Sequence, residues 1–201
     1  LIRENYKVFD AEVLKLWIEQ NPNWISFSFF FIAFFESFAG LGLFMPGVIL
    51  LAAAAGLANL YNINPFEILI YGYIGACSAD ILSFLIGNFF RNKIDSIWPF
   101  SSYPEALSKG RSFFEKYGIY GIIIGRFIGP IRPILPILAG TLNMSKQRFI
   151  AIDLFSGIPW VCFYILPPYY VTKTITENFT LLPYLIGIIF LILVILSIKK
   201  F

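Results

Sequence analysis

The sequence contains no histidine and few charged residues. Among 201 residues, Asp, Glu, Lys and Arg together make up 13%. The missing imidazole excludes phosphatases with a histidine nucleophile, Ser–His hydrolases, and haem or zinc sites that need His ligands. An aspartyl dyad or a carboxylate-held metal would need several acids within the apolar segments, which offer few. We therefore expect no catalytic residues, no metal and no cofactor, and a protein that is not an enzyme.

Cysteines and charged patches are also scarce. Cys77 and Cys162 both fall inside apolar segments, where a small buried side chain is a better interpretation than a disulfide or a metal ligand. The net charge of +3 is spread over several loops, which argues against a nucleic-acid partner. The chain opens on Leu1 without a visible cleavable leader, so we expect a few native residues to precede it.

Apolar residues dominate what is present. Hydrophobic residues make up 58% of the chain and aromatic residues 19%, including 23 Phe and 11 Tyr. This composition predicts an all-α integral membrane protein, with the aromatic side chains on lipid-facing surfaces and interfacial belts. The length suits a single membrane domain at 23–201, preceded by an amphipathic interfacial helix at 1–22. An ordinary amphipathic helix packed against the rest of the fold would explain 1–22 equally well.

Apolar runs and their interruptions define the membrane segments. The predicted full spans cover 66–90, 149–171 and 182–198. The segments at 24–60 and 117–144 are long enough to enter the membrane, turn and return, and Pro and Gly break both of them. We interpret these two as re-entrant helical hairpins, because broken backbone is tolerated at membrane depth where it lines a cavity or is buried in protein. The basic stretch at 91–116 is predicted to be a cytoplasmic loop.

The two predicted hairpins carry related patterns. Glu36 precedes Pro46 by ten residues, Arg126 precedes Pro136 by ten, and full spans follow each hairpin. The charge rule places the mouths of the two hairpins on opposite sides of the membrane, so the repeat is predicted to be inverted, as in secondary transporters. The residues predicted to break the hairpins are Pro46, Gly47, Gly129, Pro130, Pro133, Pro136 and Gly140.

Arg126 and Arg132 lie inside an apolar segment, where an arginine is costly and indicates a compensating function. They diverge on a straight helix, but a break near Gly129 would let both guanidinium groups converge on one cavity. Two such forks match the oxygens of a phosphate, which predicts substrate binding. The alternative is structural: each arginine snorkels to the headgroup layer or pairs with Glu36 or Asp80.

Three acids also lie at predicted membrane depth. Glu36 is the only acid in the first predicted hairpin. It is a candidate for substrate binding or for proton coupling, a permanent partner of an arginine, or a polar residue that lines the cavity. Asp80 and Asp153 lie on predicted full spans and are candidates for proton coupling, for lining the same cavity, or for polar contacts between helices.

From about Trp24 to Tyr170 the sequence resembles the DedA family of membrane proteins, also described as the VTT or SNARE-associated domain. Besides Glu36 with Pro46 and Gly47, the residues that carry the resemblance are Arg126, Phe127, Gly129, Arg132, Pro136, Ala139, Gly140, Met144, Phe149, Gly157 and Trp160. The resemblance implies two facing re-entrant hairpins and movement of lipids, such as undecaprenyl phosphate or phosphatidylethanolamine in bacteria. It also implies that Glu36, Arg126 and Arg132 are the essential acid and the two essential arginines.

The sequence departs from the family pattern at two positions. Val48 stands where many members have a second acid, which leaves a two-carboxylate scheme of proton coupling without its second carboxylate. Asp153 stands where Asn is commoner, and it is a candidate for the replacement charge.

We expect a multi-pass lipid translocase of the bacterial cytoplasmic membrane, similar to a flippase or scramblase. Its expected partners are a phosphate-headgroup lipid and, if transport is coupled, protons; a homo-oligomer is compatible with this function. A proton-coupled exporter of small cations or drugs is the main alternative, with Glu36 and Asp80 binding the substrate and the arginines structural. A membrane scaffold or assembly factor without transport is the third.

Overall fold

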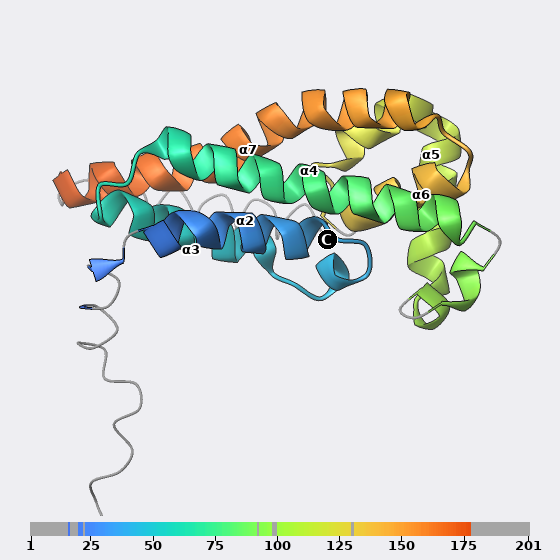
Figure 1. The fold of residues 1–201 in the computed structure, drawn as a ribbon, viewed down its shortest axis with the longest axis horizontal. Helices are drawn as coiled ribbons and strands as arrows, with labels where there is room; N and C mark the ends of the chain where they lie inside the picture. Colours follow the sequence, from blue (N-terminus) through green and yellow to red (C-terminus); the bar gives the residue numbers. More distant parts are fainter. Residues whose placement is uncertain are drawn as a thin grey trace, which may run out of the picture.

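The computed structural model describes residues 16, 20, 21, 23–91, 93–97, 100–129 and 131–177. These residues form helices and contain no strand, which confirms the predicted all-α class. The α-helices are α2 (Asn23–Ser37), α3 (Gly47–Leu60), α4 (Pro65–Phe89), α5 (Pro104–Gly125), α6 (Leu135–Thr141) and α7 (Lys146–Glu177) (Figure 1). The 3₁₀ helices are η1 (Leu41–Leu43), η2 (Ile94–Ser96), η3 (Phe100–Ser102) and η4 (Arg132–Ile134).

Within the part of the chain that the structure describes, two helices are long and apolar enough to cross a membrane. They are α4 over Pro65–Phe89 and α7 over Lys146–Thr174, at the positions of two predicted full spans. α4 begins where the Asn64 side chain accepts a hydrogen bond from the Phe66 N–H, with Pro65 at the first helical position. The predicted span at 182–198 lies outside the described residues, as does nearly all of the helix predicted at 1–22.

α2 and α3 form an antiparallel pair, which Figure 1 shows beside α4. The loop between them carries Gly40 with a φ of 95°, a backbone conformation that suits glycine. Pro46 is the N-cap residue of α3, and Gly47 is the first residue of that helix. The predicted break at these two positions is therefore the point where the chain starts its return.

α5 and α6 form a second pair in which a non-helical turn and η4 separate the two helices. α5 begins at Pro104, so residues 104–116, which we predicted as part of a polar loop, are helical. A proline and an acid in the first turn are start signals that the high charge of this stretch obscured. Gly118 has a φ of 55° and kinks α5 near the start of the predicted hairpin. Re-entrant depth in a membrane and an inverted repeat stay predictions.

Glycine residues let α4 contact both helix pairs at backbone distance. A side chain at Gly75 would collide with the backbone of Phe30 in α2, and one at Gly87 would collide with the backbone of Ile137 in α6. Gly140 of α6 meets α4 in the same way, beside the carbonyl group of Phe84. Small residues permit such close helix packing in membranes, where van der Waals contact drives helix association.

Gly140 was predicted to break the second hairpin, and that prediction is wrong. The residue lies inside α6 and is buried. Glycine is needed there for helix packing: a Cβ atom would lie 2.7 Å from the Asn88 nitrogen and would also collide with the Phe84 carbonyl oxygen.

Replacing Gly140 with alanine is therefore expected to lower the free energy of unfolding by about 2 kcal/mol, because α6 must move away from α4. Unfolding of the purified protein in detergent micelles measures this loss. Gly129→Ala is the matched control, since a Cβ atom at Gly129 meets no atom within 4 Å, and we expect a change within about 0.5 kcal/mol. Equal stability of the two variants would contradict the packing role of Gly140.

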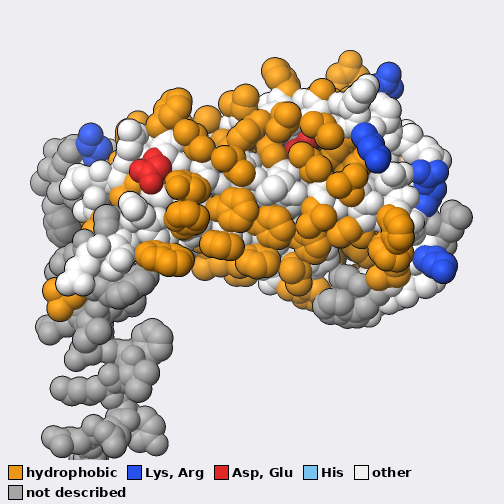
Figure 2. Space-filling model, in the orientation of Figure 1, with side chains coloured by type: hydrophobic (Ala, Val, Ile, Leu, Met, Phe, Trp, Pro, Cys, Tyr) orange, Lys and Arg blue, Asp and Glu red, His pale blue; other side chains and the backbone are white. Residues whose placement is uncertain are grey.

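The surface of the described helices is strongly apolar. Figure 2 shows hydrophobic side chains over most of the visible face, whereas Lys and Arg gather mainly at the end that carries α5 and α6. Large exposed apolar side chains recur along α4, including Phe66, Ile70, Ile74, Leu82 and Phe89. An exposed apolar surface of this extent fits contact with lipid.

Candidate functional site

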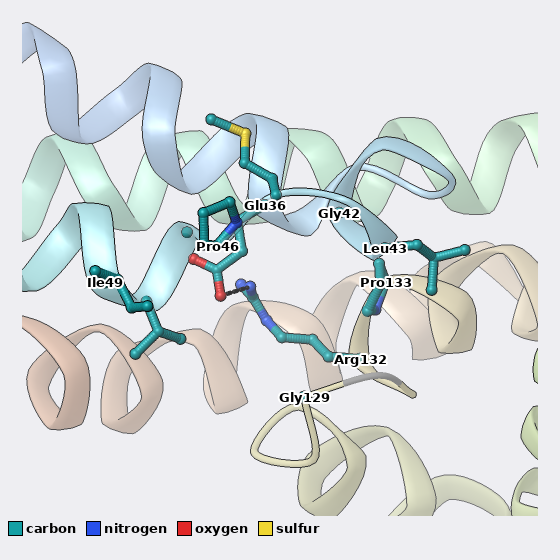
Figure 3. A pocket seen from close by; sticks show the side chains of 11 residues that line it. Glu36, Gly42, Leu43, Pro46, Ile49, Gly129, Arg132 and Pro133 are labelled. Atoms are coloured by element: carbon teal, nitrogen blue, oxygen red, sulfur yellow. Dashed lines mark ion pairs between the residues drawn. The ribbon is translucent and has the colours of Figure 1, made fainter.

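A cavity of about 370 Å³ lies between the return loop of the α2/α3 pair and the turn of the α5/α6 pair. Figure 3 shows Glu36 and Arg132 next to each other among its lining residues, joined by an ion pair. The lining residues are Glu36, Gly42, Leu43, Met45, Pro46, Gly47, Val48, Ile49, Gly129, Arg132 and Pro133. The cavity therefore brings together the breaks of the two predicted hairpins, one acid and one arginine.

Arg132 begins η4 and is buried, with 4% of its surface exposed. Its Nη2 donates a hydrogen bond of 2.6 Å to the Ser37 hydroxyl oxygen, and Nη1 lies 3.0 Å from Glu36 Oε1. The guanidinium carbon lies 3.8 Å from the centre of a Trp160 ring, a cation–π arrangement. The Arg132 Nε and Nη1 atoms make no hydrogen bond with the described residues. The group is fixed in place, its Nη1 is held by the ion pair with Glu36, and its Nε keeps an N–H donor without an acceptor among the described residues.

Glu36 lies in the last turn of α2, and its carboxylate is packed against the start of α3. A Cβ atom at Gly47 would overlap the Glu36 side chain, so glycine is required for this approach. Oε1 is paired with Arg132, whereas Oε2 has no hydrogen-bond partner among the described residues. Glu36 is therefore both the ion-pair partner of the arginine and a wall of the cavity.

Arg126 occupies a different environment. Its Nη1 donates hydrogen bonds to the Asp153 carbonyl oxygen at 2.6 Å and to the Ser156 hydroxyl oxygen at 2.8 Å. Its Nη2 donates to Asp153 Oδ1 at 2.8 Å and to Asp80 Oδ2. All four side chains are at most 4% exposed. The adjoining space is only about 10 Å³, roughly the room for one water molecule.

The two arginines thus have different partners in this conformation. Arg132 lines both spaces, whereas Arg126 lines only the small one together with Asp80 and Asp153. The pairings of arginine with Glu36 and with Asp80 that the structural alternative predicted are the ones present. Phosphate binding by either arginine, and proton coupling by any of the acids, stay predictions.

The other residues predicted to break the second hairpin lie in different parts of the structure. Gly129 lies in the turn and lines the cavity, Pro133 lies in η4, and Pro136 lies in the first turn of α6, where a proline fits a helix. Pro130 lies outside the described residues. Cys77 is free and buried, as predicted, whereas Cys162 is free and only half-buried.

Sequence reasoning missed the hydroxyl groups that hold the arginines. Ser37 follows Glu36 directly, and its own hydroxyl donates to the Ala33 carbonyl oxygen at 2.7 Å. Ser156 lies three residues after Asp153, one helical turn along α7. A serine within one helical turn of a charged residue in an apolar segment is the signal that could have identified both, because buried charges need extra hydrogen bonds.

A domain family and several bacterial membrane proteins are similar to this chain. The VTT domain matches residues 45–170. The inner membrane protein YabI of Escherichia coli (strain K12) is 30% identical over 156 residues, which cover 77% of this chain and 61% of YabI. An uncharacterized membrane protein of Buchnera aphidicola subsp. Baizongia pistaciae is 31% identical over 150 residues, 75% of this chain and 58% of the relative. Protein DedA of Escherichia coli (strain K12) is 29% identical over 171 residues, 83% of this chain and 77% of DedA.

The chain spans about three fifths of the length of the first two relatives. No solved structure matches it. The names of the relatives indicate a bacterial membrane location. Because the VTT domain covers more than half of the sequence, the chain belongs to the DedA family of VTT-domain membrane proteins.

Proposed function

We propose that this protein is a lipid translocase that moves lipids with a phosphate headgroup across the bacterial cytoplasmic membrane. The observation that carries the proposal is Arg132, a buried guanidinium group at the wall of the cavity whose Nε has no acceptor among the described residues and whose Nη1 is held only by the Glu36 ion pair. A phosphate supplies the charge and the several acceptor oxygens that such a group can bind. Undecaprenyl phosphate and phosphatidylethanolamine are the candidate substrates.

The surroundings of the cavity support a lipid over a water-soluble ion. Val48 and Ile49 line it and are 41% and 70% exposed, so the cavity opens at an apolar part of the surface. In a bilayer that surface faces acyl chains, and a headgroup can enter sideways while its tail stays in lipid. Only the charged headgroup then needs polar partners on the way across.

In the proposed transport step, a phosphate and the Glu36 carboxylate compete for Arg132. A phosphate that binds the guanidinium displaces the Glu36 carboxylate, which then has no cation in a buried site. An unpaired buried carboxylate is costly, and binding a proton removes its charge. In this proposal the two helix pairs are re-entrant, inverted hairpins that rock about the cavity, and the proton on Glu36 couples transport to a pH gradient.

Transfer in liposomes tests the proposal. We expect the reconstituted protein to accelerate the transfer of labelled undecaprenyl phosphate or phosphatidylethanolamine at least about ten-fold over protein-free liposomes, about 1.4 kcal/mol of barrier. A labelled glycosylceramide, which has a polar headgroup without phosphate, is the control and should not respond. Measuring the rate of lipid transfer with and without a pH gradient tests whether transport is coupled to protons.

A lack of acceleration for both phosphate lipids would overturn the proposal. Transport of small cations that Glu36→Gln abolishes and that arginine-to-lysine changes leave intact would favour the exporter instead.

A further inference from the structure

The first turn of α3 lies at the cavity and contains backbone N–H groups that have no acceptor among the described residues. The N–H groups of Ile49 and Leu50 donate to the Pro46 carbonyl oxygen, at 3.1 and 3.2 Å. Those of Gly47 and Val48 have no acceptor among the described residues, as expected for the first positions of a helix. Gly47 and Val48 both line the cavity.

Nothing in α3 itself neutralises this end of the helix. The N-cap residue Pro46 provides no side-chain hydrogen bond, and the first turn contains no acid. A helix of 14 residues carries roughly half a positive charge at its N-terminus, which attracts anions. The first turn of α3 is therefore a positively polarised part of the cavity wall.

A second and independent feature points to the same place. Arg132 is 4% exposed and lines the same cavity; its Nε lacks an acceptor among the described residues, and its Nη1 contacts only the Glu36 carboxylate, as an ion pair of 3.0 Å. Glu36 lies between the two positive groups: its carboxylate pairs with Arg132 and packs against Gly47. An anion already occupies this space, yet its Oε2 makes no hydrogen bond with the N–H groups of α3. The position suits an anion with more acceptor oxygens than a carboxylate.

We propose that the N-terminus of α3 and Arg132 together form a phosphate-binding seat, in which Glu36 is the resident anion of this conformation. The phosphate accepts hydrogen bonds from the N–H groups of Gly47 and Val48 and from the Arg132 guanidinium, in place of Glu36. This proposal rests on the proposed function and names the groups that bind the headgroup. A lipid headgroup and a free phosphate ion share this chemistry, and the experiment separates them.

Amide chemical shifts of the unmodified chain test the seat directly. Protein labelled with ¹⁵N-valine is titrated in detergent micelles with dihexanoylphosphatidic acid, with sodium phosphate and with dihexanoylglycerol, which lacks the phosphate. The Val48 signal is assigned by its disappearance in Val48→Ala. We expect a saturable downfield shift of the Val48 amide proton with a phosphate probe, because the N–H group gains a charged acceptor.

The three probes also identify the source of the phosphate. Saturation by dihexanoylphosphatidic acid at lower concentration than by sodium phosphate assigns the seat to a lipid headgroup, and the reverse order assigns it to the free ion. A saturable shift with neither phosphate probe, or an equal shift with dihexanoylglycerol, would overturn the proposal.

A substitution at Val48 tests whether the seat matters for transport. Val48→Pro removes one N–H group at a first-turn position where proline is tolerated, and Val48→Ala is the reference variant that keeps the N–H group. We expect Val48→Pro to bind dihexanoylphosphatidic acid about ten-fold more weakly than Val48→Ala, the effect of one charge-assisted hydrogen bond. A micelle unfolding measurement confirms that both variants fold.

The two proposals fail in different ways. If the wild-type protein transfers phosphate lipids but Val48→Pro equals Val48→Ala and the Val48 amide does not shift, the seat is wrong and the translocase stands. If no phosphate lipid is transferred although the amide shift occurs, the translocase is wrong and the seat stands.

Discussion

Replacing Arg132 with lysine is expected to reduce phosphate-lipid transfer about 100-fold, the loss of two charge-assisted hydrogen bonds. The guanidinium group contacts Ser37, Glu36 and Trp160 at the same time, and its Nε has no acceptor among the described residues. A lysine ammonium is a point charge on a flexible stem and cannot maintain this planar arrangement while it also binds a phosphate. The initial rate of lipid transfer in liposomes, at equal protein content, measures the effect.

The matched control for this substitution is Arg111→Lys. Arg111 also pairs with a carboxylate, its Nη2 donating to both oxygens of Asp95 at 2.9 Å, but its side chain is 39% exposed and does not line the cavity. We expect its transfer rate to equal that of the wild type, because exposed ion pairs contribute little. Near-normal transfer by Arg132→Lys would contradict a phosphate fork at this position.

Replacing Arg126 with methionine is expected to lower the free energy of unfolding by about 4 kcal/mol. The substitution leaves Asp80 and Asp153 buried at 2% and 1% exposure without their shared cation. Two uncompensated carboxylates in an apolar interior are among the most destabilising changes that a side chain can cause. Unfolding in detergent micelles measures the loss, and Arg111→Met at an exposed pair should cost less than about 1 kcal/mol.

A triple variant decides between the two interpretations of Arg126. Adding Asp80→Asn and Asp153→Asn to Arg126→Met removes the orphaned charges, and we expect it to restore at least half of the lost stability. If Arg126 only neutralises the two aspartates, the stable triple variant transfers lipid normally. If Arg126 also binds phosphate in another conformation, the triple variant is folded but inactive. A triple variant no more stable than Arg126→Met would show that the charge pairing is not what stabilises this centre.

Local patterns in the sequence were enough for the class of the fold. Long apolar runs predicted the spans at 66–90 and 149–171, where α4 and α7 lie, because a helix that satisfies its own backbone is the economical form for such a run. The pair Pro46 and Gly47 located the start of α3 for a similarly local reason: proline fits the beginning of a helix and not its interior. Residues 104–116 were wrongly predicted as a loop because their polar composition outweighed the helix start signal of Pro104.

Gly140 shows where local reasoning stops. A glycine close to prolines suggests a break in a helix, yet Gly140 lies within α6 at the point where this helix contacts the α4 backbone at Phe84. The two residues are far apart in the sequence, and neither their identity nor their spacing encodes the contact. A packing role of this kind depends on the neighbouring helix, so sequence periodicity does not reveal it.

By itself, the sequence determined that this protein is helical and apolar and that Arg126, Arg132 and three acids must be compensated, because an isolated charge in an apolar interior is too costly. Only the tertiary structure decided the pairing. Arg132 joins Glu36 and Ser37, the latter 95 residues away, and Arg126 joins Asp80 and Asp153, which are 46 and 27 residues away. Charge alone does not predict which acid pairs with which arginine, because Coulomb attraction favours any arginine–carboxylate pair. Helix packing selects among them, because it places α3 and Glu36 beside one arginine and seals the other from the cavity.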